Sequence, residues 1–194
     1  LLVGAALAVA GAVMQAIFGN PLAEPGVVGV SSGAALGAAT AIVLGASVLG
    51  GAGIAVFAFL GALLATLLVY VVSRAGGRTE VVTLLLTGIA INAFAQAGIA
   101  FVLFVADTAS REQIVFWQLG SIAGSLWSQV AIVAAVGVAG VIAAILLAQR
   151  LDLLALGERN ARHLGVNVER LRLVSIVLVA LLTGVAVAFT GIIA

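Results

Sequence analysis

The stretch GAALAVAGAVMQAIFGNPLAEPGVVGVSSGAALGAA, residues 4–39, decides the fold class of this chain. Its first apolar run ends at NPLAEPG, which holds both prolines of the chain, Pro21 and Pro25. Proline lacks a backbone N–H and clashes with the preceding helical turn, so two prolines in one short segment predict a helix end and an irregular turn. A second apolar run follows, with Ser31 and Ser32 in position to cap it. The stretch therefore predicts two apolar helices joined by a proline-containing turn.

The composition extends this prediction to the whole chain. Of the 194 residues, 64% are hydrophobic and 8% are charged, whereas soluble domains carry about 25% charged residues. The apolar runs are about twice as long as the segments of about ten residues in a transmembrane β-barrel. We therefore expect an all-α, polytopic transmembrane helical bundle. The net charge of +1 gives no reason to expect nucleic-acid binding, and the absence of cysteine excludes disulfides.

Hydropathy and helix breakers divide the chain into six expected transmembrane helices within one domain. These spans are expected at residues 1–18, 32–49, 54–73, 81–105, 130–148 and 173–190. Between the fourth and fifth, the stretch QIVFWQLGSIAGSLW predicts a short interfacial helix, with Trp117 and Trp127 at the level of the lipid headgroups. A polar segment, residues 149–172, joins the last two spans.

The arginines indicate which side of the membrane each loop faces. All eight basic residues are arginine, and alternating spans place seven of them on one side: Arg74, Arg78, Arg150, Arg159, Arg162, Arg170 and Arg172. The other side holds Arg111 alone. Cytoplasmic loops carry such an excess of positive charge. We therefore expect the NPLAEPG turn, the RAGGRTE loop and residues 149–172 on the cytoplasmic side.

The chain shows no pattern typical of an enzyme. A nucleotide-binding P-loop requires a lysine, and this sequence has none. It also shows no paired carboxylates, no nucleophile–base set and no metal-ligand cluster, and its single histidine, His163, is expected in a solvated loop. We expect no catalytic residue, no metal site and no cofactor, so ATP-driven transport would need a separate ATPase subunit.

Small residues at every fourth position predict close helix packing. The second span carries Gly29, Gly33 and Gly37, followed by Ala41 and Gly45. The sixth repeats the pattern with Ala180, Gly184 and Ala188. Such stripes let helix backbones approach closely in a membrane, so a scaffold role is favoured over a ligand site.

Polar residues within the spans have two possible roles. Asn92 and Gln96 lie on one face of the fourth span, and Gln15 lies in the first. In hydrocarbon, such side chains turn inward, toward another helix or a water-filled cavity. They therefore form either interhelical hydrogen bonds or a pathway wall. No span carries an ionisable residue near its middle, which disfavours a proton-coupled transporter.

The polar segment 149–172 contains leucines, which are expected to be buried against another surface. A short amphipathic helix is expected between Gly157 and Gly165, with Gly165 in position to end it. Such a helix would lie on the membrane or dock into a partner protein.

These motifs together resemble a known family. Residues 4–39 resemble the hallmark segment of FecCD-type permeases, and LALGERNARHLGVNVERLR, residues 154–172, is similar to that family's coupling segment. These permeases are the membrane subunits of bacterial ABC importers for iron–siderophore complexes, haem and cobalamin. The resemblance covers essentially the whole chain. It implies a type II ABC importer permease fold in partial form, a fragment holding about family helices two to seven of ten.

The resemblance also implies partners and a location. The permease would be a homodimer in the lipid of the bacterial cytoplasmic (inner) membrane, with cytoplasmic ABC ATPase subunits and an extracytoplasmic substrate-binding protein. Iron–siderophore is the leading ligand, with haem and cobalamin as alternatives. The family's pathway runs along the dimer interface, which Asn92 and Gln96 are expected to line, and Gln15 is a further candidate. Carried over by motif position, the ATPase-coupling residues are Leu156, Gly157, Glu158, Arg159, Ala161, Arg162, Leu164 and Gly165.

Two other interpretations remain open at the level of sequence. A secondary transporter driven by an ion gradient would use unwound helices at mid-membrane, and the NPLAEPG break offers it some support. The other is a non-transporting membrane scaffold, which would be favoured if mutation of Gly157 and Arg162 left ATPase binding and uptake unchanged.

Overall fold

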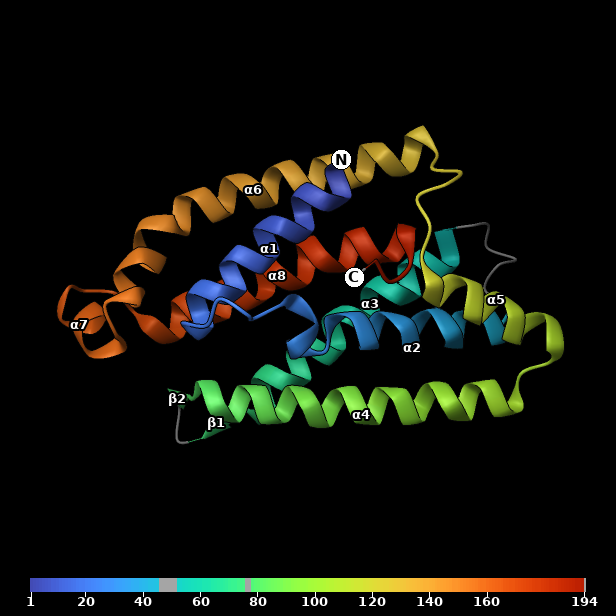
Figure 1. Ribbon diagram of the computed structural model, residues 1–194, viewed down its shortest axis with the longest axis horizontal. Helices are drawn as coiled ribbons and strands as arrows, with labels where there is room; N and C mark the ends of the chain where they lie inside the picture. Colours follow the sequence, from blue (N-terminus) through green and yellow to red (C-terminus); the bar gives the residue numbers. More distant parts are fainter. Residues whose placement is uncertain (46–51, 76–77, 194) are drawn as a thin grey trace.

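The computed structural model describes residues 1–45, 52–75 and 78–193, and within these ranges it is a helical bundle (Figure 1). Its helices are α1 (Leu2–Phe18), the 3-10 helix η1 (Pro25–Val28), α2 (Val30–Val43), α3 (Ala52–Val72), α4 (Val81–Val105), α5 (Thr108–Leu119), α6 (Trp127–Ala155), α7 (Glu158–His163) and α8 (Val168–Thr190). Two short strands, β1 (Arg74–Ala75) and β2 (Arg78–Thr79), form one antiparallel pair. The expected all-α bundle is confirmed.

Among the described residues, four helices are long and apolar enough to cross a bilayer. Helices α3, α4, α6 and α8 have 21, 25, 29 and 23 residues and mean hydropathies of 2.6, 2.0, 2.9 and 2.6, where about 20 residues suffice to span the hydrocarbon core. Helices α1 and α2 are shorter, with 17 and 14 residues. The expected end of the second span, with the turn predicted at Gly50 and Gly51, lies outside the described residues.

Helix α8 forms the centre of the bundle. It packs against α1, α2, α3 and α6, and its most apolar stretch is 72% buried. Figure 1 shows α6 along one flank and α4 along the other, with α2 and α3 between α8 and α4. The corresponding stretch of α4 is only 17% buried, so α4 presents most of its apolar surface outward.

The two ends of the bundle differ in charge. Figure 1 shows α7, β1 and β2 at one end of the long axis and α5 at the other. Seven of the eight arginines belong to β1, β2, α7 and the adjoining ends of α6 and α8, whereas Arg111 belongs to α5. The arrangement agrees with the predicted sidedness, which stays a prediction.

Helices α2 and α3 meet backbone to backbone at the glycine stripe. A Cβ atom built on Gly33 would lie 2.4 Å from the carbonyl oxygen of Gly61, and one on Gly37 would lie 2.2 Å from that of Phe57. Real Cβ atoms do not approach so closely, so only glycine fits. Gly29 has a positive φ of 82° and joins η1 to α2. The three stripe residues therefore lie at the junction of η1, α2 and α3.

The start of α2 differs from the expectation. Its N-cap is Gly29, without a side-chain cap, and the helix begins at Val30. Ser32 is inside the helix, where its Oγ contacts the Gly29 carbonyl oxygen at 3.2 Å. The expected capping role of Ser31 and Ser32 is therefore wrong, because η1 and the left-handed glycine begin the helix earlier.

Three further helix limits differ from the expected ones. Helix α5 covers Thr108–Leu119 rather than residues 113–127, because the Asp107 carboxylate accepts a hydrogen bond from the Ser110 N–H at 2.8 Å and caps it. Helix α6 continues through QRLDLLA to Ala155, because this stretch contains no helix breaker. Helix α8 begins at Val168, where Asn167 caps the first turn.

Candidate functional site

Helix α7 is a short helix held between two left-handed glycines. Gly157 precedes it with φ 96°, and Gly165 follows it with φ 84°. At its end, the Val166 N–H donates to the Ala161 carbonyl at 2.9 Å and the Gly165 N–H donates to the Arg162 carbonyl at 3.0 Å. These two bonds form a Schellman motif, which satisfies carbonyls at a helix end. The backbone thereby fixes α7 as a compact projection between α6 and α8.

Most of the α7 surface is unburied. Of residues 155–165, all of which the structure describes, Ala161 is the only buried one. Leu156 and Leu164 flank the helix and are each 59% exposed. The projection thus offers two apolar side chains among charged ones to a protein partner. We call residues 156–165 the α7 surface.

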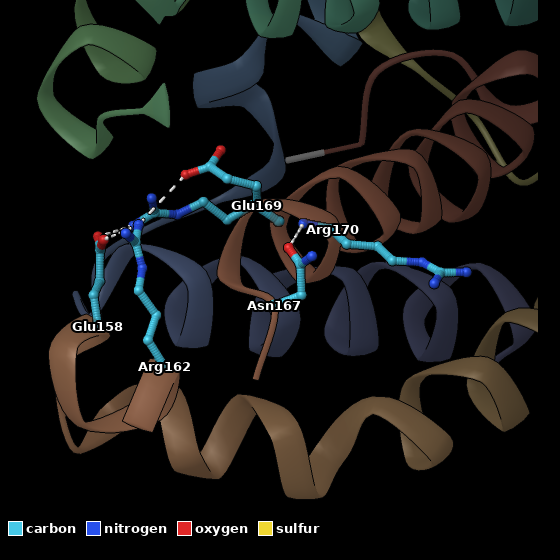
Figure 2. A network of polar contacts seen from close by, with 6 residues as sticks. Glu158, Arg162, Asn167, Glu169 and Arg170 are labelled. Atoms are coloured by element: carbon cyan, nitrogen blue, oxygen red, sulfur yellow. Dashed lines mark hydrogen bonds and ion pairs between the residues drawn. The ribbon is translucent and has the colours of Figure 1, made fainter. Parts of the chain in front are cut away.

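An ion-pair network connects α7 to the first turns of α8 (Figure 2). An Arg162 guanidinium nitrogen lies 3.5 Å from a Glu158 carboxylate oxygen and 3.7 Å from one of Glu169. Glu158 also pairs with Arg172, whose side chain is only 2% exposed. Exposed pairs contribute little to stability, but a buried guanidinium is costly to leave without its carboxylate. The Glu158–Arg172 pair is therefore the main polar attachment of α7 to the central helix.

A cavity of 520 Å³ lies between α7 and the start of α4. Glu80 and Val81 line it on the α4 side, and Arg159 and Arg162 line it on the α7 side. Helix α7 is thus adjacent to α4 and attached to α8. A displacement of α7 would act directly on α8, because ion pairs join these two helices.

A second hollow, of 530 Å³, lies where α2, η1 and α4 meet, and Asn92 is on its wall. The Asn92 Nδ2 donates to the Gly26 carbonyl at 3.1 Å, and its Oδ1 accepts from the Ser32 Oγ at 2.5 Å. This amide therefore fastens α4 to η1 and α2. Gln96 lines the same hollow and is exposed.

The structure does not bring all three polar candidates together. Asn92 and Gln96 share the hollow, whereas Gln15 is exposed on α1 and does not line it. Glu24 does line it, and the sequence interpretation missed this carboxylate. The sequence signal for it was an acidic residue between the two prolines of NPLAEPG. Non-helical backbone at membrane depth occurs where it is buried in protein or lines a cavity.

Among the described residues, no group of three His, Cys, Asp or Glu side chains is placed to hold a metal ion.

Comparison with known proteins agrees with this geometry. The model of the FecCD transport family matches residues 1–194. The hemin transport system permease protein of Yersinia pestis is 39% identical over an alignment of 196 positions, which covers 100% of this chain and 58% of that protein. The vitamin B12 import system permease protein of Vibrio cholerae is 40% identical over 191 residues, 98% of this chain and 57% of that protein. The chain therefore spans just over half the length of these curated relatives.

A solved structure has the same fold. A metal-chelate type ABC transporter in an inward-facing conformation superimposes with a TM-score of 0.90 and 32% identity, covering 100% of this chain and 61% of that one. The expected ABC importer permease fold is thus confirmed, and with the four apolar helices the match places the chain in the cytoplasmic membrane. The chain belongs to the FecCD transport family.

Proposed function

We propose that this chain forms the membrane-spanning permease part of an ATP-driven importer for a metal-chelate ligand. The relatives named for hemin and vitamin B12 and the metal-chelate transporter support this ligand class. An iron–siderophore complex remains our first candidate within it, with haem and cobalamin as alternatives. The permease works as a homodimer with cytoplasmic ATPase subunits and an extracytoplasmic binding protein.

The observation that carries the proposal is the α7 surface. It is exposed, bounded by two left-handed glycines and attached through Glu158 and Arg172 to the central helix. A surface of this kind converts a push from a motor protein into motion of the bundle. In the proposed cycle, closure of the ATPase pair presses on α7, and α8 moves with it. Helix α2, which packs against both α8 and α4, passes the movement on to α4. The coupling residues inferred from the sequence motif all lie on this projection.

Helix α4 is the proposed contact with the second permease copy. Its outward face carries large apolar side chains: Phe94, Phe101 and Phe104 are 75%, 66% and 80% exposed. The hollow with Asn92, Gln96 and Glu24 opens beside this helix. A ligand is moved only if the two conformational states differ in affinity for it. We propose that these polar side chains contact the ligand as it passes along α4.

The test of coupling uses the full-length permease with its ATPase in proteoliposomes. Replacing Leu156 and Leu164 by Asp should abolish ATPase co-purification and ATP-driven uptake, because both side chains are exposed and the fold does not need them. The matched control is Leu126→Asp, since Leu126 is also 59% exposed but belongs to the opposite end of the bundle. Unchanged ATPase binding by the double variant would overturn the coupling role.

The test of the pathway replaces Gln96 by Leu. This change should lower uptake and leave assembly with the ATPase intact, because Gln96 is exposed in the hollow. Normal uptake would remove Gln96 from the pathway. Uptake that requires an ion gradient and no ATP would favour a secondary transporter instead, and no uptake under either condition would favour a scaffold.

A further inference from the structure

A groove of 620 Å³ lies between the end of α6 and the start of α8. Arg150 of α6 and Arg170 of α8 both line it, and its walls include Leu147, Leu153 and Val174. It is separate from the hollow beside Asn92. The groove thus combines two guanidinium groups with an apolar wall.

The two arginines of this groove lack an internal counter-charge. Within the described ranges, neither guanidinium forms an ion pair or a side-chain hydrogen bond. The nearby acidic residues are directed elsewhere: Asp152 lines a different groove, between α1 and α6, and Glu169 pairs with Arg162. Figure 2 shows the Arg170 side chain extending away from the Glu158, Arg162 and Glu169 cluster. Two cations beside one cavity with no carboxylate in its lining attract an anion.

Further apolar side chains of the same two helices are exposed near the groove. Leu146 of α6 is 75% exposed, and Val174 and Val177 of α8 are 41% and 44% exposed. These residues lie on the parts of α6 and α8 that are apolar enough to cross a bilayer. A free inorganic anion would make no favourable contact with these apolar side chains, whereas the acyl chains of a lipid would pack against them.

We propose that this groove binds an anionic phospholipid of the cytoplasmic leaflet, with its phosphate between Arg150 and Arg170 and its acyl chains along α6 and α8. Basic pockets between transmembrane helices on the cytoplasmic side suit such headgroups. The predicted sidedness places the arginine-rich end at that leaflet. Leu164, Gly165 and Asn167 also line the groove, so the lipid contacts the segment that joins α7 to α8. This site is independent of the transported ligand.

The test measures lipid retention by native mass spectrometry of the full-length permease, titrated with phosphatidylglycerol or phosphatidylcholine. The wild type should retain phosphatidylglycerol preferentially, and Arg150→Gln with Arg170→Gln should lower its affinity about 30-fold, from two phosphate-facing arginines. The double Lys variant should keep the preference, which shows that the fold is intact. Arg111→Gln, at the opposite end of the bundle, should bind as the wild type does. Added inorganic phosphate should not displace the lipid.

Three results would overturn the proposal. One is equal retention of phosphatidylglycerol by the wild type and the double Gln variant. A second is a photo-crosslinker at Leu147 that joins the groove to another protein segment instead of to lipid, since that segment would then be the occupant. The third is displacement of phosphatidylglycerol by inorganic phosphate, which would assign the groove to a free anion. Uptake plays no part in these readouts, so they stand apart from the test of transport.

Discussion

Helices α8 and α4 are both long and apolar, yet one is the centre of the bundle and the other lies at its flank. Their mean hydropathies are 2.6 and 2.0, but their most apolar stretches are 72% and 17% buried. Helix α6 is more apolar than either, at 2.9, and is also only 17% buried. Hydropathy therefore measures compatibility with lipid and does not show which helix is central. In a membrane, apolar packing between helices competes with equally apolar lipid.

Small residues show the difference that hydropathy hides. In α8, Ala180 and Ala188 are 2% and 5% exposed, and a Cβ built on Gly184 would lie 3.3 Å from the Phe59 ring. The exposed face of α4 instead carries phenylalanines such as Phe94, 75% exposed. Stripes of small residues mark the surfaces that pack within the chain, and large apolar residues mark those left for lipid or a second copy.

The largest expected effect comes from filling the packed interface. Gly33→Leu should lower the free energy of unfolding by at least about 3 kcal/mol, because even a Cβ at this position would clash with the Gly61 backbone. Thermal unfolding of the detergent-solubilised permease measures it. Gly11→Leu is the matched control, since a Cβ at Gly11 has nothing within 4 Å. Equal losses in both variants would remove the glycine stripe as the basis of packing.

A smaller effect is expected where α7 is attached to α8. Glu158→Gln should lower the free energy of unfolding by about 1–2 kcal/mol, because the buried Arg172 loses a charged partner. The effect is limited because the Glu158 side chain is 45% exposed and solvent screens the pair. In complex with the same variant, the ATPase subunits should hydrolyse ATP with reduced uptake per ATP, which a coupled transport and hydrolysis assay measures. Glu112→Gln on α5 provides the control for loss of an exposed carboxylate. Full coupling in Glu158→Gln would show that α7 transmits motion by another route.

At the edge of the bundle, substitutions of Asn92 and Gln96 should differ in their effect on stability. Asn92→Leu should lower the free energy of unfolding by about 0.6–1 kcal/mol, because it removes the hydrogen bonds to Gly26 and Ser32. Gln96→Leu should leave stability unchanged, since its side chain is exposed. Denaturation of the two variants under identical conditions makes the comparison. Equal stability loss would show that α4 is held through the whole polar face.

The smallest effect concerns the α5 end. Hydrogen bonds from the Ser110 side chain and backbone N–H lower the pKa of the Asp107 carboxyl below its usual 3.8. Because the folded pKa is lowered, this stabilisation is present above pH 3.8 and is lost as the pH falls through the folded pKa. Asp107→Ala should raise hydrogen exchange at the Ser110 amide and make it independent of this titration, once rates are corrected for intrinsic exchange. Unchanged protection would mean that α5 is ordered without its cap.

Much of the fold follows from local sequence, and the exceptions have identifiable causes. The expected span at residues 81–105 has the same limits as α4, because its ends are set by local polarity. The start of α2 was misplaced because Gly29 takes a left-handed conformation that only the neighbouring η1 explains. The expected span ended at residue 148, where the polar segment begins, but α6 continues to Ala155. Polar residues with good helix propensity can extend a helix beyond its apolar part.

The candidate site was predictable only where a motif marked it. The two glycines around α7 indicated its limits, but the pairing of Glu158 with Arg172 joins two helices across a turn and has no local signal. The amide of Asn92 was recognised as inward-facing, whereas its partners on η1 and α2 depend on the tertiary fold. Glu24 lay within a motif that was interpreted only as a helix break.

The most direct test of the account asks whether α7 and α5 lie on opposite sides of the membrane. This chain contains no cysteine, so single cysteines at His163 in α7 and Glu112 in α5 can be labelled in intact cells with a membrane-impermeant thiol reagent. We predict that the Glu112→Cys variant reacts in intact cells and that the His163→Cys variant reacts only after the membrane is opened. Reaction of both positions in intact cells, or of neither, would contradict it.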